Sequence, residues 1–171
     1  LLTAALLILL QNQSHSQLPG GQLSIRIASD QYWTGSTFPA ILKLPSDYAT
    51  TTRKYPLIIF LHGTGESGNN NGSQLGNIYN SSTAGGPAYF IAHNAFPDSF
   101  AHPITGQFYK FIILSPQAPG WSTSAGQLRY VLYDIIAKYR VDTNRIYLTG
   151  LSAGGQGLVD YATQRQDAPF A

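Results

Sequence analysis

The chain has 171 residues, of which 43% are hydrophobic and 11% are charged. This composition suits one compact domain with a buried core, and it argues against disorder and against a second domain. Ten Lys and Arg against eight Asp and Glu give a formal net charge of +2, and the basic residues are scattered along the chain. That distribution gives no basis for nucleic-acid binding. The absence of Cys excludes disulfides, Cys-ligated metals and a thiol nucleophile.

The first ten residues form an apolar run that is shorter than the roughly twenty residues needed to span a bilayer. Ser14 and Ser16 follow it as small residues of a cleavage pattern. We therefore predict a signal-peptide remnant over residues 1–16, a mature chain from Gln17, and a secreted or periplasmic protein without a stable membrane anchor. The alternative, a buried N-terminal helix, is disfavoured because polar residues 11–17 break its amphipathic continuation. The run has no Met or basic segment before it, which predicts a natural start further upstream.

Five segments carry strand patterns. Residues 23–27 alternate between apolar and polar side chains, and residues 40–44 suggest a second strand that ends at Pro45; both read as half-buried edge strands. Residues 57–61, 111–114 and 145–149 are more continuously apolar, which is typical of strands covered by helices on both faces.

The clearest helix pattern lies between the last two of these strands. Its apolar residues recur at helical spacing, Ser124 and Gln127 form a capping box, and Lys138 and Arg140 sit where the helix dipole favours cations. The apolar positions are Leu128, Val131, Leu132, Ile135, Ile136 and Tyr139. A strand, a helix and a strand of this kind predict a parallel βαβ unit, and therefore an α/β protein.

Residues 150–154 match the pattern G-x-S-x-G, with Ser152 at the centre. In this nucleophile elbow a sharp turn between a strand and a helix exposes a serine hydroxyl. The glycines are needed because a side chain at Gly150 or Gly154 would collide with the neighbouring strand or helix. The motif directly follows a predicted strand and precedes helically spaced residues, so we predict Ser152 as a catalytic nucleophile. The alternative is an ordinary glycine-rich βα turn, which could hold a phosphate on its N–H groups.

A second glycine-rich segment, residues 61–68, follows the apolar strand 57–61. Acyl transfer needs two backbone N–H donors for the developing oxyanion, one after the nucleophile and one after an earlier strand. Ala153 and Thr64 fit these two positions. A flexible surface turn is the alternative. Gln117 and Trp121 follow another strand and are candidates to line the substrate pocket, although Trp121 could equally cover the edge of the core.

Residues 54–63, 115–117 and 139–155 resemble, in order and spacing, secreted bacterial esterases related to polyhydroxybutyrate depolymerases and feruloyl esterases. Members of that group are also described as phospholipase/carboxylesterases or predicted peptidases. The resemblance extends from about Ile41 to Gly157. It implies an α/β-hydrolase with a mostly parallel, doubly wound sheet, whose N-terminal part would be residues 17–171. It also implies serine ester hydrolysis of small or polymer-linked acyl esters, including polysaccharide and polyester substrates, without a cofactor or metal. Where many relatives carry Met, this chain has Ala153.

In this fold the acid and the histidine of the triad follow the serine, yet no histidine follows Ser152. Asp160 and Asp167 are expected to be surface residues, and His15, His62, His93 and His102 all precede the nucleophile, with His62 expected to be structural. These observations predict a chain truncated after the elbow helix and inactive by itself. Two alternatives stay open: a serine peptidase of the same fold, and a noncatalytic remnant or binding domain.

Overall fold

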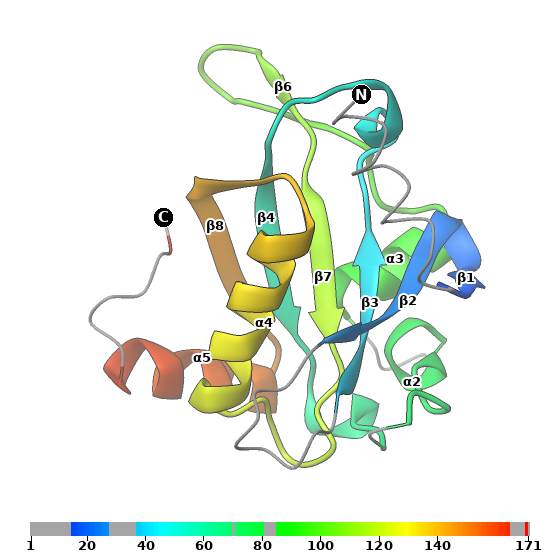
Figure 1. The fold of residues 1–171 in the computed structure, drawn as a ribbon, viewed down its shortest axis with the longest axis vertical. Coiled ribbons are helices and arrows are strands. Elements are labelled where there is room, and N and C mark those ends of the chain that lie inside the picture. The colour runs from blue at the N-terminus through cyan, green and yellow to red at the C-terminus, as the bar shows by residue number, and fades with distance from the viewer. Residues whose placement is uncertain (1–14, 28–36, 70, 81–84, 165–169, 171) are drawn as a thin grey trace.

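The structure is a computed structural model that describes residues 15–27, 37–69, 71–80, 85–164 and 170. Of the predicted signal peptide only His15 and Ser16 are described. The strands and α-helices, labelled in Figure 1, are β1 (Gln17–Leu18), β2 (Gln22–Ile27), β3 (Phe38–Lys43), β4 (Tyr55–Leu61), α2 (Gly76–Tyr79), α3 (Pro87–Ala92), β5 (Phe100–Ala101), β6 (Phe108–Tyr109), β7 (Ile112–Pro116), α4 (Ala125–Lys138), β8 (Val141–Gly150) and α5 (Ala153–Gln164). Three short 3-10 helices, η1, η2 and η3, cover Pro19–Gly21, Tyr48–Thr50 and Thr64–Glu66 in the described chain.

The main sheet has six strands within the described residues, in the order β1-β2-β3-β7-β4-β8. Strand β4 pairs in parallel with both β7 and β8, whereas β3 is antiparallel to both β2 and β7. Strands β2, β7, β4 and β8 therefore point in one direction, and β1 and β3 point in the other. The prediction of an α/β protein with a mostly parallel sheet is confirmed.

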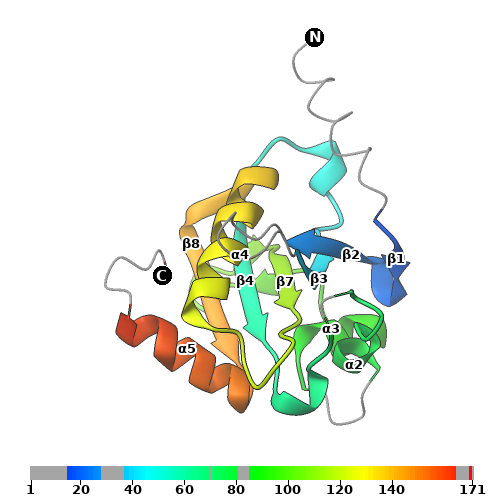
Figure 2. The ribbon, with the colours of Figure 1, turned by 60° about the horizontal axis from the view of Figure 1, so that its bottom comes forward.

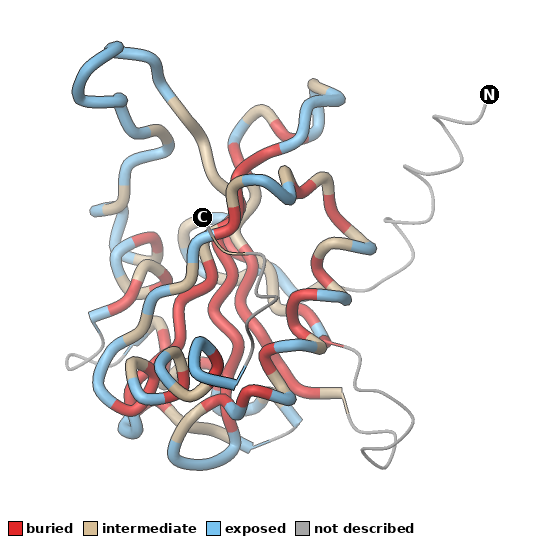
Figure 3. Tube along the Cα trace, turned by 90° about the vertical axis from the view of Figure 1, so that its left-hand side faces the viewer, coloured by how far each residue is buried: buried red, intermediate tan, exposed pale blue. Residues whose placement is uncertain are grey.

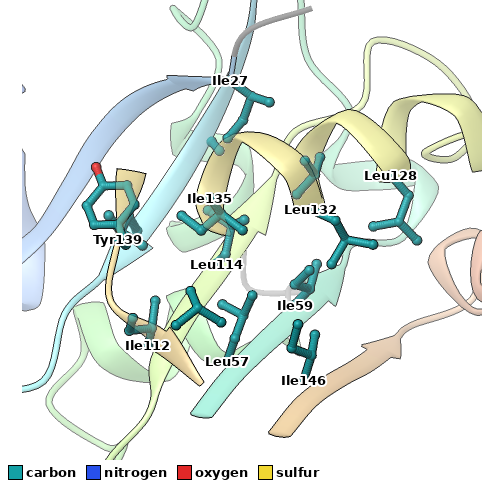
Figure 4. Close-up of a cluster of buried hydrophobic side chains, with 14 of the residues drawn as sticks. Ile27, Leu57, Ile59, Ile112, Leu114, Leu128, Leu132, Ile135, Tyr139 and Ile146 are labelled. Carbon is teal, nitrogen blue, oxygen red and sulfur yellow. The ribbon is translucent and has the colours of Figure 1, made fainter. Parts of the chain in front are cut away.

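Helix α4 covers one face of this sheet (Figure 4). Its buried residues pack on strand side chains that include Leu57 and Ile59 of β4 and Leu114 of β7. The capping box is present, since Ser124 Oγ accepts from Gln127 N–H at 3.2 Å and Gln127 Oε1 accepts from Ser124 N–H at 2.8 Å. The predicted helix is therefore confirmed, and its first turn begins where the capping pattern placed it.

The opposite face is covered by α2 and α3, which lie behind the sheet in Figure 1. Ile41 of β3 points to this side and packs with Leu75, Ile78 and Ala88, whereas its neighbours Ala40 and Leu42 belong to the core beneath α4. This alternation is the period of two that a strand imposes. The sheet is thus the middle layer of three, and its central strands are the buried red traces of Figure 3.

Two predicted strand environments are wrong. Segment 40–44 was expected at an edge, but β3 lies between β2 and β7 and all its residues except Lys43 are buried. Segment 145–149 was expected to be covered on both faces, but β8 is the last strand of the described sheet and Tyr147 is 38% exposed. Local apolar content did not distinguish the two because strand order depends on pairing between distant segments.

The sequence patterns also missed the hairpin of β5 and β6 and the short helices α2 and α3. The two hairpin strands have two residues each, and α2 has four. Elements of this length carry too few residues for a period to be visible. The hairpin extends beyond the amino ends of the parallel strands, at the top of Figure 1.

Candidate active site

Ser152 occupies the turn between β8 and α5. Its φ is 53°, in the left-handed region that non-glycine residues rarely adopt, and such strain is retained where surrounding structure enforces it. Ser152 is exposed. The predicted turn geometry is therefore present, with the serine accessible at the carboxyl end of β8.

The glycines that flank Ser152 are required by close backbone packing. A Cβ placed on Gly154 would lie 2.0 Å from the carbonyl oxygen of Leu61, and one placed on Gly150 would lie 2.6 Å from the carbonyl carbon of Gly154. Atoms at these distances overlap, so neither position can carry a side chain unless the backbone moves. By contrast, a Cβ on Gly155 would lie 3.7 Å from its nearest neighbour, the oxygen of Gly150.

The glycine-rich loop after β4 lies directly beside the elbow. A Cβ placed on Gly63 would lie 3.7 Å from the Cβ of Ser152, and Leu151 N–H donates to the carbonyl oxygen of Leu61 at 3.0 Å. The two segments singled out in the sequence therefore meet at the carboxyl edge of the sheet, where β4 and β8 end (Figure 2).

His62 fixes this loop from inside. It is 1% exposed, and its Nε2 lies 2.8 Å from the Ala118 nitrogen, whose N–H donates to it. Nδ1, which lies 2.7 Å from the Gly63 oxygen, therefore carries the ring proton and donates to that carbonyl. Burial lowers the pKa of His62, against an opposing effect of the Gly63 hydrogen bond. Because both ring nitrogens are engaged, His62 is structural, as the sequence predicted.

Glu66 closes the loop from its other end. Its Oε2 accepts from Gly63 N–H at 2.9 Å, and its own N–H donates to the Gly63 oxygen at 3.1 Å. The side chain is 3% exposed, so burial raises the pKa of Glu66, while the Gly63 hydrogen bond opposes that rise. Gly63 is thus held through both its N–H and its C=O.

This hold on Gly63 orients the next amide. No peptide bond in the described chain is cis, and in a trans peptide the C=O of one residue and the N–H of the next point in opposite directions. Since the Gly63 carbonyl is directed to His62, the Thr64 N–H is directed away from that ring. Ala153 is the first residue of α5, so its N–H has no acceptor within the helix. Their role as the predicted oxyanion donors stays a prediction.

The remaining candidates are placed as follows. Gln117 is 1% exposed and donates through Nε2 to the carbonyl oxygens of Glu66 (3.1 Å) and Gln74 (2.7 Å), so its side chain supports the loop from behind. A Cβ on Gly68 would lie 2.3 Å from this amide, which explains the glycine there. Trp121 is 65% exposed. Contact of either residue with substrate stays a prediction.

No described histidine is placed as a base for Ser152. His93 is at the end of α3, with Nδ1 2.8 Å from the Tyr89 oxygen. His102 is in the hairpin, at the opposite end of the parallel strands from the elbow (Figure 1). Asp160 is on α5, where it accepts from Gln156, and Asp167 lies outside the described residues.

The described residues contain no group of three or more His, Cys, Asp or Glu that could hold a metal ion. In the same part of the chain, no helix has the length and apolar character that a membrane crossing requires.

No family model and no curated protein matches the chain. Among solved structures, it is similar to a thermostable esterase at 26% identity with a TM-score of 0.47, over 78% of this chain and 36% of that chain. The chain thus spans about a third of the length of that esterase. The sheet order and the elbow of this chain are those of an α/β-hydrolase fold.

The glycine requirement can be tested with two neighbouring substitutions. Gly154→Ala should lower the free energy of unfolding by about 1–3 kcal/mol, because its Cβ would overlap the Leu61 carbonyl. Gly155→Ala is the matched control, since it meets only ordinary contacts in the same helical turn and alanine favours the helix. Denaturant unfolding of both variants measures the difference. Equal stabilities would contradict the close packing.

The buried imidazole should make stability depend on pH. Because the pKa of His62 is lowered from 6.5, the unfolded chain binds a proton below pH 6.5 that the folded chain does not, and the free energy of unfolding falls as the pH falls from there. His62→Gln should reduce this loss, as measured by denaturant unfolding at about pH 7 and about pH 5.

His93→Gln, on the exposed end of α3, serves as the control, because it replaces a histidine without changing the buried loop. Glu66, with its raised pKa, gives stability the opposite dependence above pH 4.5, so the comparison between variants isolates His62. The same pH dependence in His62→Gln as in the wild type would show that His62 does not titrate as described.

Proposed function

We propose that this protein is a secreted serine-dependent carboxylic-ester hydrolase that works through an acyl-enzyme on Ser152. The observation that supports this most is the meeting of the strained, exposed serine with the loop of Gly63 and Thr64. An ordinary βα turn would not require a strained serine beside a second loop held by buried hydrogen bonds.

In the proposed reaction Ser152 Oγ attacks the ester carbonyl carbon while a general base takes its proton. The carbonyl oxygen becomes an oxyanion, which the N–H groups of Thr64 and Ala153 stabilise. The bond to the alcohol oxygen then breaks, and the base returns the proton to the alcohol. Water, deprotonated by the same base, releases the acid and restores the serine. One such donor contributes roughly a factor of 10²–10³ to kcat.

The proposal requires a base that the described residues do not place beside Ser152. A serine hydroxyl is a weak nucleophile without one, and His62 has no free nitrogen. We therefore expect the acid and the base to come from outside the described residues and the 171-residue chain to be inactive by itself.

We further propose that the substrate is a small acyl ester or one linked to a polysaccharide or polyester. The predicted signal peptide supports an extracellular or periplasmic location, where such polymers are encountered. The chemistry itself needs neither a metal nor an organic cofactor, because a base and two N–H donors suffice for acyl transfer.

The nucleophile is tested by labelling the complete natural protein with a fluorophosphonate. We expect one covalent adduct at Ser152, none in Ser152→Ala, and unchanged labelling in Ser73→Ala, whose serine is exposed in the turn before α2. Mass spectrometry of the adduct locates it. Persistent labelling of Ser152→Ala would overturn the proposal. Rates on p-nitrophenyl acetate and on a peptide anilide then separate ester from amide hydrolysis.

The oxyanion donor is tested by Thr64→Pro, which removes the amide hydrogen, and Thr64→Ala controls for the loss of the threonine side chain. Residue 64 is the first of a 3-10 helix and Gly63 is extended, with a ψ of 169°, a position and a preceding conformation that both suit proline. We expect kcat on p-nitrophenyl acetate to fall by roughly 10²–10³, with little change in Thr64→Ala. Wild-type kcat in the proline variant would assign the donor elsewhere.

A further inference from the structure

A hollow lies away from the elbow, between the hairpin and the sheet. Its volume is about 310 Å³, near the lower end of the roughly 300–1,000 Å³ usual for ligand pockets. Tyr147 faces it from β8, on the side opposite Ile146, which packs beneath α4. The lining residues are Pro56, Phe100, Ala101, His102, Tyr109, Phe111, Arg145 and Tyr147.

Aromatic rings form its apolar walls. Phe100 and Phe111 meet edge to face with centroids 5.7 Å apart, and Phe111 meets Tyr147 in the same way at 6.2 Å. Phe100 and Tyr147 are each 38% exposed. The rings are thus held by one another while part of their surface remains open, so a ligand would not need to order them first.

Two hydrogen-bond donors stand among these rings. Arg145 donates through Nε to Asp142 Oδ2 at 2.7 Å, which positions the guanidinium while its Nη groups remain for other acceptors. His102 Nδ1 accepts from the N–H groups of Ile104 and Thr105, both at 3.2 Å, so its proton lies on Nε2.

The charge around the hollow favours an anion. The hydrogen bond from Arg145 is the main cause that lowers the pKa of Asp142, and the charge of Lys54 adds to it. Arg145 and Lys54 thus both act on the one carboxylate of Asp142. The lining has no carboxylate or amide side chain to accept the hydroxyl protons of a sugar, so aromatic rings and donors together suit a flat ring with a negative group.

We propose that this hollow binds a monocyclic aromatic carboxylate. Its ring packs against Phe100, Phe111 and Tyr147, where edge-to-face contacts favour aromatic over aliphatic groups. Its carboxylate accepts from the Arg145 guanidinium, whose planar fork matches the two oxygens, and from His102. The site is separate from the elbow and does not depend on hydrolysis.

Binding is tested on the full chain by NMR titration with benzoate, with benzyl alcohol and methyl glucoside as comparison probes. We expect saturable shifts with benzoate at the Tyr147 and Phe100 amides, at least tenfold weaker binding of benzyl alcohol, and no binding of the glucoside.

Arg145→Gln should weaken the binding of benzoate about tenfold without changing the binding of benzyl alcohol, and Tyr147→Ala should weaken the binding of both. Arg145→Lys, which keeps the charge but not the fork, should weaken benzoate less.

Tyr133→Ala, which removes an aromatic ring that is 60% exposed on α4, is the control and should bind benzoate like the wild type. The amide spectrum of each variant reports whether it folds. Absence of saturable benzoate shifts, equal binding of benzoate and benzyl alcohol, or preferential binding of the glucoside would each overturn the proposal.

Discussion

The contact on which the candidate site depends is the approach of the first turn of α5 to the end of β4. Gly154 comes so near the Leu61 carbonyl that a single added carbon would lie 2.0 Å from it. This contact brings the turn with Ser152 beside the loop with Gly63. It also explains why Ser152 can hold a φ of 53°, because β8 pairs with β4 up to Gly150 and the close packing begins immediately after.

The loop beside Ser152 is held by buried polar groups. His62 and Glu66 are both nearly inaccessible, and burial shifts their pKa values in opposite directions, toward the neutral form of each. A buried group without partners would be costly, but here each one binds the backbone of Gly63. Burial remains the larger effect on both pKa values, and Glu66 Oε1 has no hydrogen-bond partner among the described residues. The hydrogen bonds to Gly63 return part of the desolvation cost and fix one peptide unit, as a preorganised oxyanion site requires.

The sequence predicted the parts of this architecture that depend on neighbouring residues. The α4 cap needs only Ser124 and Gln127, three positions apart, and the elbow needs only five consecutive residues. It did not predict that β3 is internal and β8 external, because that depends on β7 inserting between β3 and β4. Gln117 illustrates the same limit: its amide bonds residues 43 and 51 positions away, and no local pattern reveals these partners.

The position of His62 also bears on where a base for Ser152 would have to come from. His62 and the loop occupy the side of Ser152 that faces β4, and both of its ring nitrogens are engaged. In the described part of the sheet β8 has a neighbour on one side only, and the exposed Ser152 follows directly from it. For an imidazole to act as the general base that deprotonates Ser152 Oγ, it must lie within hydrogen-bond distance of that oxygen. In the proposed mechanism this imidazole therefore approaches from the open side of β8, across the turn from the Thr64 amide.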